Sequence, residues 1–342
     1  MKSLKLWIKR LLVAVLALVA VAVMIGTGYE AKMRRQAARD YPAPGRLIDI
    51  GGRKIQLDCR GSGSPIVVLE AGLDGNGSLA WAKVHDSIAV TTRACAYSRA
   101  GVMWSDDNPG HQSAVMIATD LKAALVAAGE NAPYVMVGHS LGGPYIMTFT
   151  KLHEADVAGL VFVDASHPEQ VQRFKSALGR QLEPPIGMMQ AAAKLAWTGI
   201  VRVAMAVGGA AGADPVALTT AAYAPTSLGP MLEELDAMDS TMAQAGSFRR
   251  LGNRPLVVLT AMAPTDTNQL KMMKMSQEES GRFKAAWKEM HDEEATWSTQ
   301  SEHILVPDAT HYIQYDRPDI VIAAVRKVVG LVRNPVAVPD VH

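Results

Sequence analysis

The stretch of sequence that decides the fold is YVMVGHSLGGPYIMTFT, residues 134–150. An apolar run at 134–137 leads directly into Gly-His-Ser-Leu-Gly, and a second apolar run at 144–150 follows. The glycines at 138 and 142 allow a strand and a helix to approach closely around a sharp turn, with Ser140 in a strained conformation and its hydroxyl exposed. We therefore expect a strand, a nucleophile turn and a helix. The alternative is a glycine-rich turn in which Ser140 only caps the helix.

Short apolar runs recur on both sides of this stretch. Residues 46–50 and 54–59 predict a hairpin joined at Gly51-Gly52. The later runs are continuous and β-branched, which is typical of parallel strands covered on both faces. Strand–helix alternation predicts a doubly wound, mostly parallel α/β sheet with its functional site at the carboxyl ends of the strands. The other expected strands are 65–70, 92–97, 134–137, 159–163, 255–260 and 303–306, and the clearest helices are 113–128 and 318–332, the second capped by Asp316.

Two intervals interrupt this alternation. Residues 167–252 lie between two core strands, carry only helical patterning, and have the size and position of a cap over the strand ends. Residues 262–302 form a second, largely charged helical insertion. We therefore expect a core made of residues 46–166 and 253–334, with a helical cap at 167–252.

Composition is that of a globular, enzyme-sized chain. The 342 residues are 49% hydrophobic and 20% charged, with 34 Lys+Arg against 33 Asp+Glu. The interior has no basic stripe, so we expect no nucleic-acid partner, because phosphate recognition needs concentrated positive charge. The sequence contains no HExxH, CxxC or Walker motif and no strand-linked GxGxxG, so it predicts neither a metal nor a cofactor.

The N-terminal residues 1–28 predict a membrane segment. Basic residues precede an unbroken apolar run at 11–25 that continues to Gly28 and spans about 27 Å as a helix, barely enough to cross a hydrocarbon core. An uncleaved anchor and a cleaved signal peptide both fit this pattern. We favour the anchor, because the well-placed small-x-small pattern at 20–22 lies inside the apolar run. Residues 29–45 then read as a linker, and the body is expected outside the cytoplasm.

A serine hydroxyl is a weak nucleophile at neutral pH, so it needs a base and an orienting acid. The expected base is His311, in the loop immediately after the last strand. Two aspartates compete for the role of acid: Asp164 directly follows the strand at 159–163, and Asp266 comes some residues after the strand at 255–260. We favour Asp164, because its strand fixes its position better, and keep Asp266 as the alternative.

An acyl-transfer site also needs donors for the developing oxyanion, each worth roughly 2.7–4 kcal/mol. The backbone N–H of Leu141, next to the serine, is one candidate. The second is the N–H of Leu73, in the glycine-rich loop after the strand at 65–70. Among the other histidines, His139 is expected to pack locally, whereas His167 follows a strand end and is a candidate for lining the pocket.

These residues resemble the α/β-hydrolase fold superfamily over about residues 46–332. The resemblance implies the sheet, a helical cap and a Ser-His-Asp hydrolase, and a serine nucleophile differs from the aspartate of haloalkane dehalogenases and epoxide hydrolases. Ser98 stands where the family usually has Asp. Besides the serine turn and His311, the motifs that carry the resemblance are Leu69-Glu70-Ala71-Gly72, Tyr97-Ser98-Arg99-Ala100-Gly101, Val163-Asp164-Ala165-Ser166-His167-Pro168 and Asp316-Arg317-Pro318.

We therefore expect a membrane-tethered serine hydrolase that cleaves an ester-like or other acyl substrate through an acyl-enzyme. Cleavage of an amide or C–C bond by the same triad is one alternative, and a non-catalytic binding module is another. The methionines of the two insertions fit either ordinary helix core or an adaptable lid for a small hydrophobic acyl substrate. They are Met188, Met189, Met205, Met231, Met238, Met242, Met272, Met273 and Met275.

The two cysteines, Cys59 and Cys95, fall on strands that we expect to be neighbours. Export would place them in an oxidising compartment, where a disulfide forms readily. A disulfide and a pair of buried free thiols both remain open from the sequence.

Overall fold

The computed structural model describes residues 2–108, 110, 112–182, 186–207 and 214–335. Within them lies an eight-stranded sheet of order β1-β2-β4-β3-β5-β6-β7-β8, in which β1, β2 and β4 pair antiparallel and the remaining neighbours pair parallel. The predicted doubly wound sheet is confirmed. The strands are β1 (Arg46–Asp49), β2 (Lys54–Arg60), β3 (Ile66–Glu70), β4 (Ala94–Ser98), β5 (Tyr134–His139), β6 (Val157–Val163), β7 (Leu256–Ala261) and β8 (Ser301–Val306).

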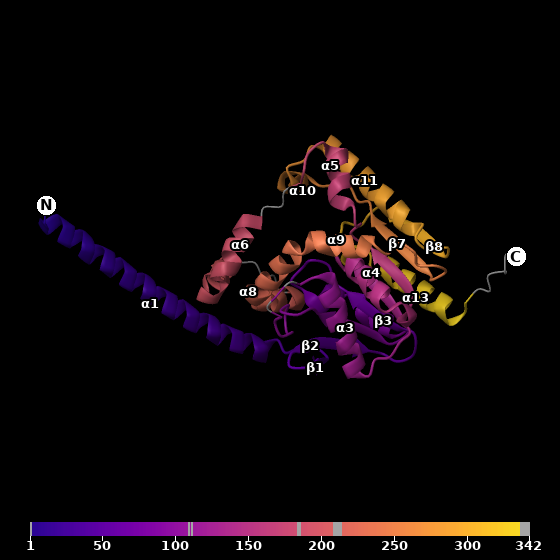
Figure 1. Cartoon of the computed structure of the whole chain (residues 1–342), viewed down its shortest axis with the longest axis horizontal. Helices are drawn as coiled ribbons and strands as arrows, with labels where there is room; N and C mark the ends of the chain where they lie inside the picture. Colours follow the sequence, from indigo (N-terminus) through magenta and orange to yellow (C-terminus); the bar gives the residue numbers. More distant parts are fainter. Residues whose placement is uncertain (1, 109, 111, 183–185, 208–213, 336–342) are drawn as a thin grey trace.

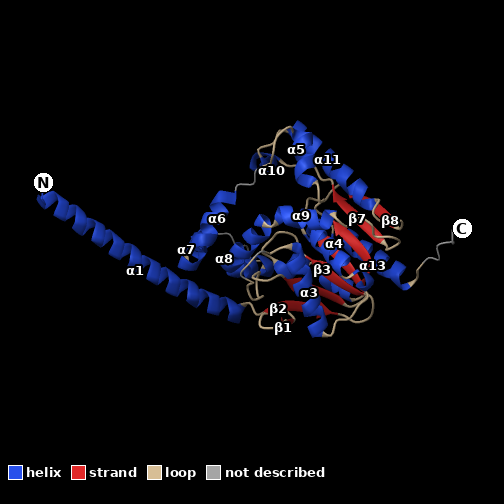
Figure 2. Cartoon of the chain, in the orientation of Figure 1, coloured by secondary structure: helices blue, strands red, loops and turns tan. Residues whose placement is uncertain are grey.

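Helices cover both faces of the sheet (Figure 1, Figure 2). Apolar residues of α3 and α4 pack on one face, and those of α2 and α13 pack on the other. The helices are α1 (Lys2–Asp40), α2 (His85–Ala89), α3 (Ala114–Ala128), α4 (Gly142–Leu152), α5 (Gln170–Leu178), α6 (Ile186–Leu195), α7 (Ile200–Val207), α8 (Pro215–Asp236), α9 (Met238–Gly246), α10 (Thr267–Met273), α11 (Gln277–Ala295), α12 (Ile313–Asp316) and α13 (Pro318–Arg333), with short 3₁₀ turns η1 (Gly77–Trp81), η2 (Glu154–Asp156) and η3 (Ala196–Thr198).

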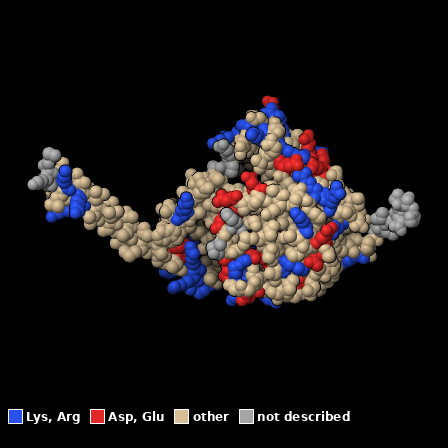
Figure 3. All heavy atoms as spheres, in the orientation of Figure 1, with Lys and Arg blue, Asp and Glu red and all other residues tan. Residues whose placement is uncertain are grey.

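The N-terminal helix α1 is one continuous rod that projects from the body (Figure 1). The helix Ser3–Asp40 is long and apolar enough to cross a membrane, and its shaft is free of charged side chains between basic groups near its two ends (Figure 3). Residues 29–45 were expected to be a linker, but the helix continues to Asp40. The reason is that residues 29–41 contain neither Gly nor Pro and are rich in good helix formers, whereas Pro42 follows immediately.

The two insertions consist of helices, as their patterning predicts. Residues 167–252 carry α5 to α9, and residues 183–185 and 208–213 of this expected cap lie outside the described residues. Residues 262–302 carry α10 and α11. Helix α5 of the first insertion packs against α11 of the second, so the two insertions meet beside the carboxyl ends of β6 and β7.

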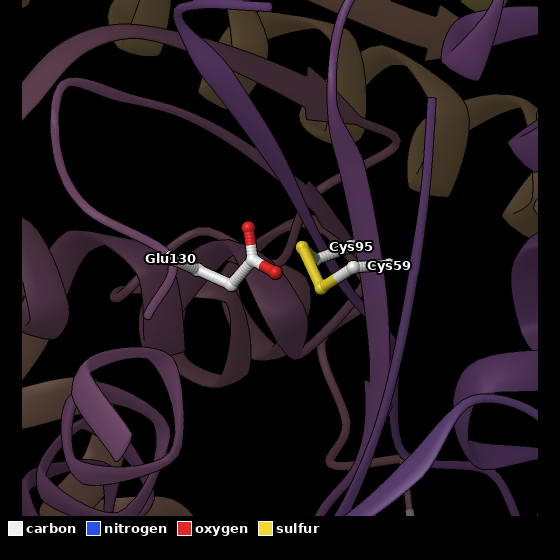
Figure 4. Close-up of side chains that lie close together, drawn as sticks. All are labelled: Cys59, Cys95 and Glu130. Atoms are coloured by element: carbon white, nitrogen blue, oxygen red, sulfur yellow. A yellow bond between two sulfur atoms is a disulfide. The ribbon is translucent and has the colours of Figure 1, made fainter. Parts of the chain in front are cut away.

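Cys59 and Cys95 are paired directly across β2 and β4 and are joined in a disulfide. The carboxylate of Glu130 lies beside the two sulfurs (Figure 4). This group does not have the chemistry of a metal site, because disulfide sulfurs lack the thiolates that bind metals. The Glu130 carboxylate instead accepts two hydrogen bonds from Arg93, at 2.5 and 2.8 Å.

Candidate active site

Ser140 occupies the turn between β5 and α4 with a φ of +51°, a left-handed conformation that is strained for a residue with a side chain. Glycines on either side make this turn possible. A Cβ at Gly138 would lie 2.6 Å from the Gly142 carbonyl oxygen, and a Cβ at Gly142 would lie 2.5 Å from that of Glu70. The serine side chain is partly exposed and borders a cavity at the carboxyl ends of the strands.

His311 lies in the loop after β8, and its Nδ1 is 2.6 Å from Oδ2 of Asp164. Asp164 directly follows β6, and its other carboxylate oxygen accepts hydrogen bonds from the Ala261 backbone N–H at 2.8 Å and the Trp287 indole N–H at 2.9 Å. Burial by itself would raise the pKa of Asp164, but the hydrogen bond and charge of His311 outweigh it and keep the pKa below its usual value. The carboxylate is therefore ionised and held in one orientation.

The alternative acid, Asp266, lies elsewhere. It is the N-cap of α10, where its carboxylate accepts hydrogen bonds from the backbone N–H groups of Asn268 and Gln269 at 2.7 and 2.9 Å. A polar residue just before a helix commonly accepts such hydrogen bonds, because the first helical N–H groups have no partner within the helix.

Asp316 was expected to be the N-cap of α13, and this was wrong, because Arg317 occupies that position. The Asp316 carboxylate instead accepts hydrogen bonds from the backbone N–H and the hydroxyl of Thr310, at 2.8 and 2.6 Å. Thr310 precedes His311, so Asp316 holds the loop that carries the imidazole.

His139 packs locally, as expected, but the residue that it packs against is His311. Its buried Nε2 donates a hydrogen bond to the His311 carbonyl oxygen at 2.9 Å, and the two rings are 4.7 Å apart. Burial, together with the charge of His311, lowers the pKa of His139 to about 3, so the ring is neutral. His139 therefore supports the backbone of the base, a contact that the sequence interpretation missed.

His167 was proposed as a residue that lines the pocket, and the structure corrects this. Its ring is fully buried 5.6 Å from that of Trp297, and its Nδ1 accepts a hydrogen bond from the Glu169 N–H at 3.1 Å. It is absent from the described residues around the cavity that Ser140 borders. Four residues beyond the end of β6, the chain turns the His167 side chain into the core, which the sequence pattern could not distinguish.

The loop after β3 passes directly against the serine turn, since a Cβ at Gly72 would lie 2.9 Å from the Ser140 Cβ. Arg99 fixes this loop by donating to the carbonyl oxygens of Ala71 and Gly72 at 2.8 and 2.7 Å. Among the described residues, the backbone N–H groups of Leu73 and Leu141 donate no hydrogen bond. Both expected oxyanion donors are therefore unpaired.

Arg99 also pairs with two buried carboxylates, Glu70 at 2.8 Å and Glu234 at 2.7 Å. Glu234 belongs to α8, so this cluster joins the first insertion to the core. Burial raises the pKa of Glu70 to about 7, and burial raises the pKa of nearby Asp74 to about 6. The sequence motifs contain Glu70 and Arg99, but nothing in the sequence marks Glu234 as their partner.

The cavity beside Ser140 has a volume of about 480 Å³ and a predominantly apolar lining contributed by α5, α10, α11 and the loops after β7 and β8. The rings of Phe174 and Phe283 stack there at 4.2 Å. Of the insertion methionines, Met273 lines the cavity, whereas Met242 is buried against Leu141. The side chain of Met272 lies outside the described part of the chain. The methionines of the first insertion therefore form no lid over this cavity.

Known proteins resemble this chain mainly in fold. A probable transporter of Hormonema carpetanum is 38% identical over 128 residues, which cover 35% of this chain and 18% of that protein. The chain matches between 18% and 50% of the length of the first curated relatives. An esterase from Thermogutta terrifontis aligns with a TM-score of 0.54 at 16% identity, covering 84% of this chain and 97% of that one.

A putative epoxide hydrolase from Pseudomonas aeruginosa aligns with a TM-score of 0.59 at 18% identity, covering 86% of this chain and 97% of that one. At such identities, the likeness establishes the fold alone. The sequence model of the family described as "Alpha/beta hydrolase family" matches residues 57–324, which include the serine turn, Asp164 and His311. The resemblance noted in the sequence is thereby confirmed: the chain belongs to the alpha/beta hydrolase family.

Proposed function

We propose that this protein is a serine hydrolase that cleaves ester-like or other acyl substrates through an acyl-enzyme intermediate. The observation that carries the proposal is the 2.6 Å contact between His311 and Asp164 at the edge of the cavity that Ser140 borders. Ser140 and His311 both line this cavity, where a substrate could reach the serine side chain. Serine, imidazole and carboxylate in one cavity are the groups that acyl transfer requires.

In the proposed reaction, Ser140 Oγ forms a bond to the substrate carbonyl carbon while its proton passes to His311 Nε2. That proton then moves to the departing alcohol as the ester bond breaks and the acyl-enzyme forms. Water attacks the acyl-enzyme with the imidazole again as base, releasing the acid and restoring Ser140. Asp164 keeps the Nδ1 proton of His311 in place and stabilises the imidazolium.

The backbone N–H groups of Leu141 and Leu73 are the proposed oxyanion donors. Leu141 is the N-cap of α4, and Arg99 holds the loop that carries Leu73 through two carbonyl oxygens. Donors that are fixed before the reaction stabilise the developing charge without reorganising, and each is worth roughly 2.7–4 kcal/mol.

The cavity supports a small, largely apolar acyl group as substrate. Its aromatic wall comes from Phe174, Phe283 and Trp287, and its volume is about 480 Å³. We propose that residues 46–166 and 253–334 form the catalytic core and that 167–252 form its cap, with α10 and α11 also contributing to the wall. A series of p-nitrophenyl esters of increasing acyl length, with matched anilides, would define the preferred length and distinguish ester from amide cleavage.

A fluorophosphonate probe tests the proposal directly. The full chain should be labelled at Ser140, and labelling should disappear in Ser140→Ala and in protein heated past unfolding. Ser78→Ala is a matched control, because Ser78 is buried away from the cavity and its loss should leave labelling intact. Folded wild-type protein that neither reacts with the probe nor hydrolyses any ester would instead indicate a binding module without catalysis.

We also propose that α1 is an uncleaved membrane anchor with the body outside the cytoplasm. Residues 3–22 are all exposed and rise about 30 Å, the thickness of a bilayer core. The Cys59–Cys95 disulfide is consistent with an oxidising compartment. Intact mass of membrane-extracted protein should include residues 1–28, and a C-terminal alkaline phosphatase fusion should be active. A mature chain that lacks this segment would identify a signal peptide.

A further inference from the structure

The short helix α7 and the turn η3 before it present an apolar surface that no other described part of the protein covers. It consists of Trp197, Ile200, Val203 and Val207, and we call it the α7 face. All four side chains are exposed, and Val207 reaches 84%. The spacing of Ile200, Val203 and Val207 places them on one side of α7, whereas Arg202 on the opposite side is 7% exposed. Trp197 lies in η3, just before the helix.

Arg202 fixes this helix against α1. Its guanidinium donates two hydrogen bonds to the Glu30 carboxylate, at 2.8 and 3.0 Å, and Arg34 donates a third at 2.9 Å. Glu30 is 2% exposed, so the ion pair is sealed between the two helices. Breaking such a buried pair leaves an uncompensated charge, so α7 stays at this position along α1.

A close backbone contact independently fixes the position of η3 and α7 along α1. A Cβ at Gly26 would lie 2.1 Å from the Thr198 carbonyl oxygen, and a Cβ at Gly199 would lie 2.7 Å from that of Gly26. Only glycine at these two sites lets η3 approach α1 this closely. The α7 face therefore starts beside the last turn of the apolar part of α1.

The surface of a bilayer would lie near Gly26 if α1 spans that bilayer. Residues 3–22 are all exposed and provide the length of one bilayer core. Gly26 follows one turn later, and basic side chains of Lys32, Arg34 and Arg35 come next. Tryptophan on an amphipathic helix, with basic residues at the same level, is typical of the interface between headgroups and acyl chains.

We infer that the α7 face inserts into the headgroup–acyl boundary of the bilayer that α1 crosses. The inference rests on the proposed anchor and adds a second, non-spanning membrane contact. Two contacts hold the body in a fixed orientation on the membrane, whereas a single helix would let it tilt. The occupant is lipid and not a second protein, because η3 and α7 are held against α1 directly after the apolar stretch that is long enough to cross a membrane.

Spin labelling of the full chain in phosphatidylcholine–phosphatidylglycerol vesicles tests this inference. The two native cysteines form the disulfide, so single introduced cysteines can be labelled selectively. Val207→Cys reports on the α7 face, and Val90→Cys is the matched control, since Val90 is 83% exposed after α2, a helix that packs on α13 away from α1. We expect several-fold greater accessibility to oxygen relative to a nickel chelate at Val207→Cys than at Val90→Cys. Leu16→Cys in α1 reports on the anchor.

If the label at Leu16→Cys lies in the bilayer but the labels at Val207→Cys and Val90→Cys have the same relative accessibility to oxygen, the inference is overturned while the anchor stands. If Leu16→Cys also matches Val90→Cys, the anchor fails and the inference falls with it. Dipolar broadening at Val207→Cys would show that a second copy covers the face, and would likewise overturn it. Melting of each labelled protein at the wild-type temperature establishes that the fold is intact.

Discussion

Trp287 donates its indole N–H to one oxygen of the Asp164 carboxylate at 2.9 Å, while the other oxygen faces His311 at 2.6 Å. Trp287 belongs to α11, in the second insertion, so this insertion reaches the acid of the candidate triad. The carboxylate cannot rotate without breaking both contacts. We therefore assign Trp287 the role of a positioning residue as well as a part of the cavity wall.

Trp287→Phe should lower kcat about 10- to 100-fold and leave KM nearly unchanged, because a hydrogen bond to a charged group is worth about 1.5–3 kcal/mol. The phenyl ring keeps the stack with Phe174, whose centroid lies 5.4 Å away. Steady-state kinetics on the preferred ester measures kcat and KM separately. Trp197→Phe, on the exposed α7 face, is the control, and an unchanged kcat in Trp287→Phe would remove the positioning role.

Asp164→Asn should reduce kcat by about 10⁴ with the fold retained, because the amide no longer fixes the productive tautomer of His311. Asp266→Asn provides the comparison within the same chain. Asn is also a good N-cap, so α10 should persist and kcat should stay near the wild-type value. Kinetics and circular dichroism on both variants would check this, and an inactive Asp266→Asn with an active Asp164→Asn would reverse the assignment.

Arg99→Met should destabilise the protein by about 3–5 kcal/mol, since it leaves Glu70 and Glu234 buried without their cation. It should also lower kcat, because the loop that carries Leu73 loses its two hydrogen bonds. Denaturant unfolding in detergent measures the first effect. Lys327→Met breaks an exposed pair with Glu302 and should change stability little. An equal loss of unfolding free energy in Arg99→Met and Lys327→Met would contradict the prediction that a buried ion pair matters more than an exposed one.

Asp74→Asn should make the protein more stable at neutral and alkaline pH. Burial raises the pKa of Asp74 to about 6, above the ordinary 3.8, and one carboxylate oxygen is buried without a hydrogen-bond partner among the described residues. The folded state thus binds the proton more tightly than the unfolded state. As pH rises from about 4 to above 6, ionisation of Asp74 therefore lowers the free energy of unfolding by about 3 kcal/mol in total.

Because Asn cannot ionise and still accepts the 2.8 Å hydrogen bond from the Asn76 N–H, it escapes this penalty. Unfolding free energies of wild type and Asp74→Asn should therefore differ most above pH 7 and converge towards pH 4. A variant that is less stable than wild type at pH 8 would mean that the ionised carboxylate has a favourable partner.

Local sequence determined the strands, the serine turn and the order of the candidate triad. Glycine at 138 is required by a backbone contact with Gly142 within the serine turn, and continuous apolar runs suffice to identify buried parallel strands. Such features depend on neighbouring residues, so a pattern in one chain reveals them. The helix formers at 29–40 carry the same kind of local information, and Pro42 marks where the helix ends.

Only the tertiary structure shows that Asp164 contacts His311 and that Asp266 caps α10, because both aspartates follow strands whose carboxyl ends meet at one edge. The partners Glu234 and Trp287 come from insertions whose helices can dock in many ways, and no spacing along the chain encodes how they pack. The same holds for Arg202 and Glu30, which are 172 residues apart in sequence. Contacts between distant segments follow from burial and charge compensation in three dimensions, which periodicity along one chain does not record.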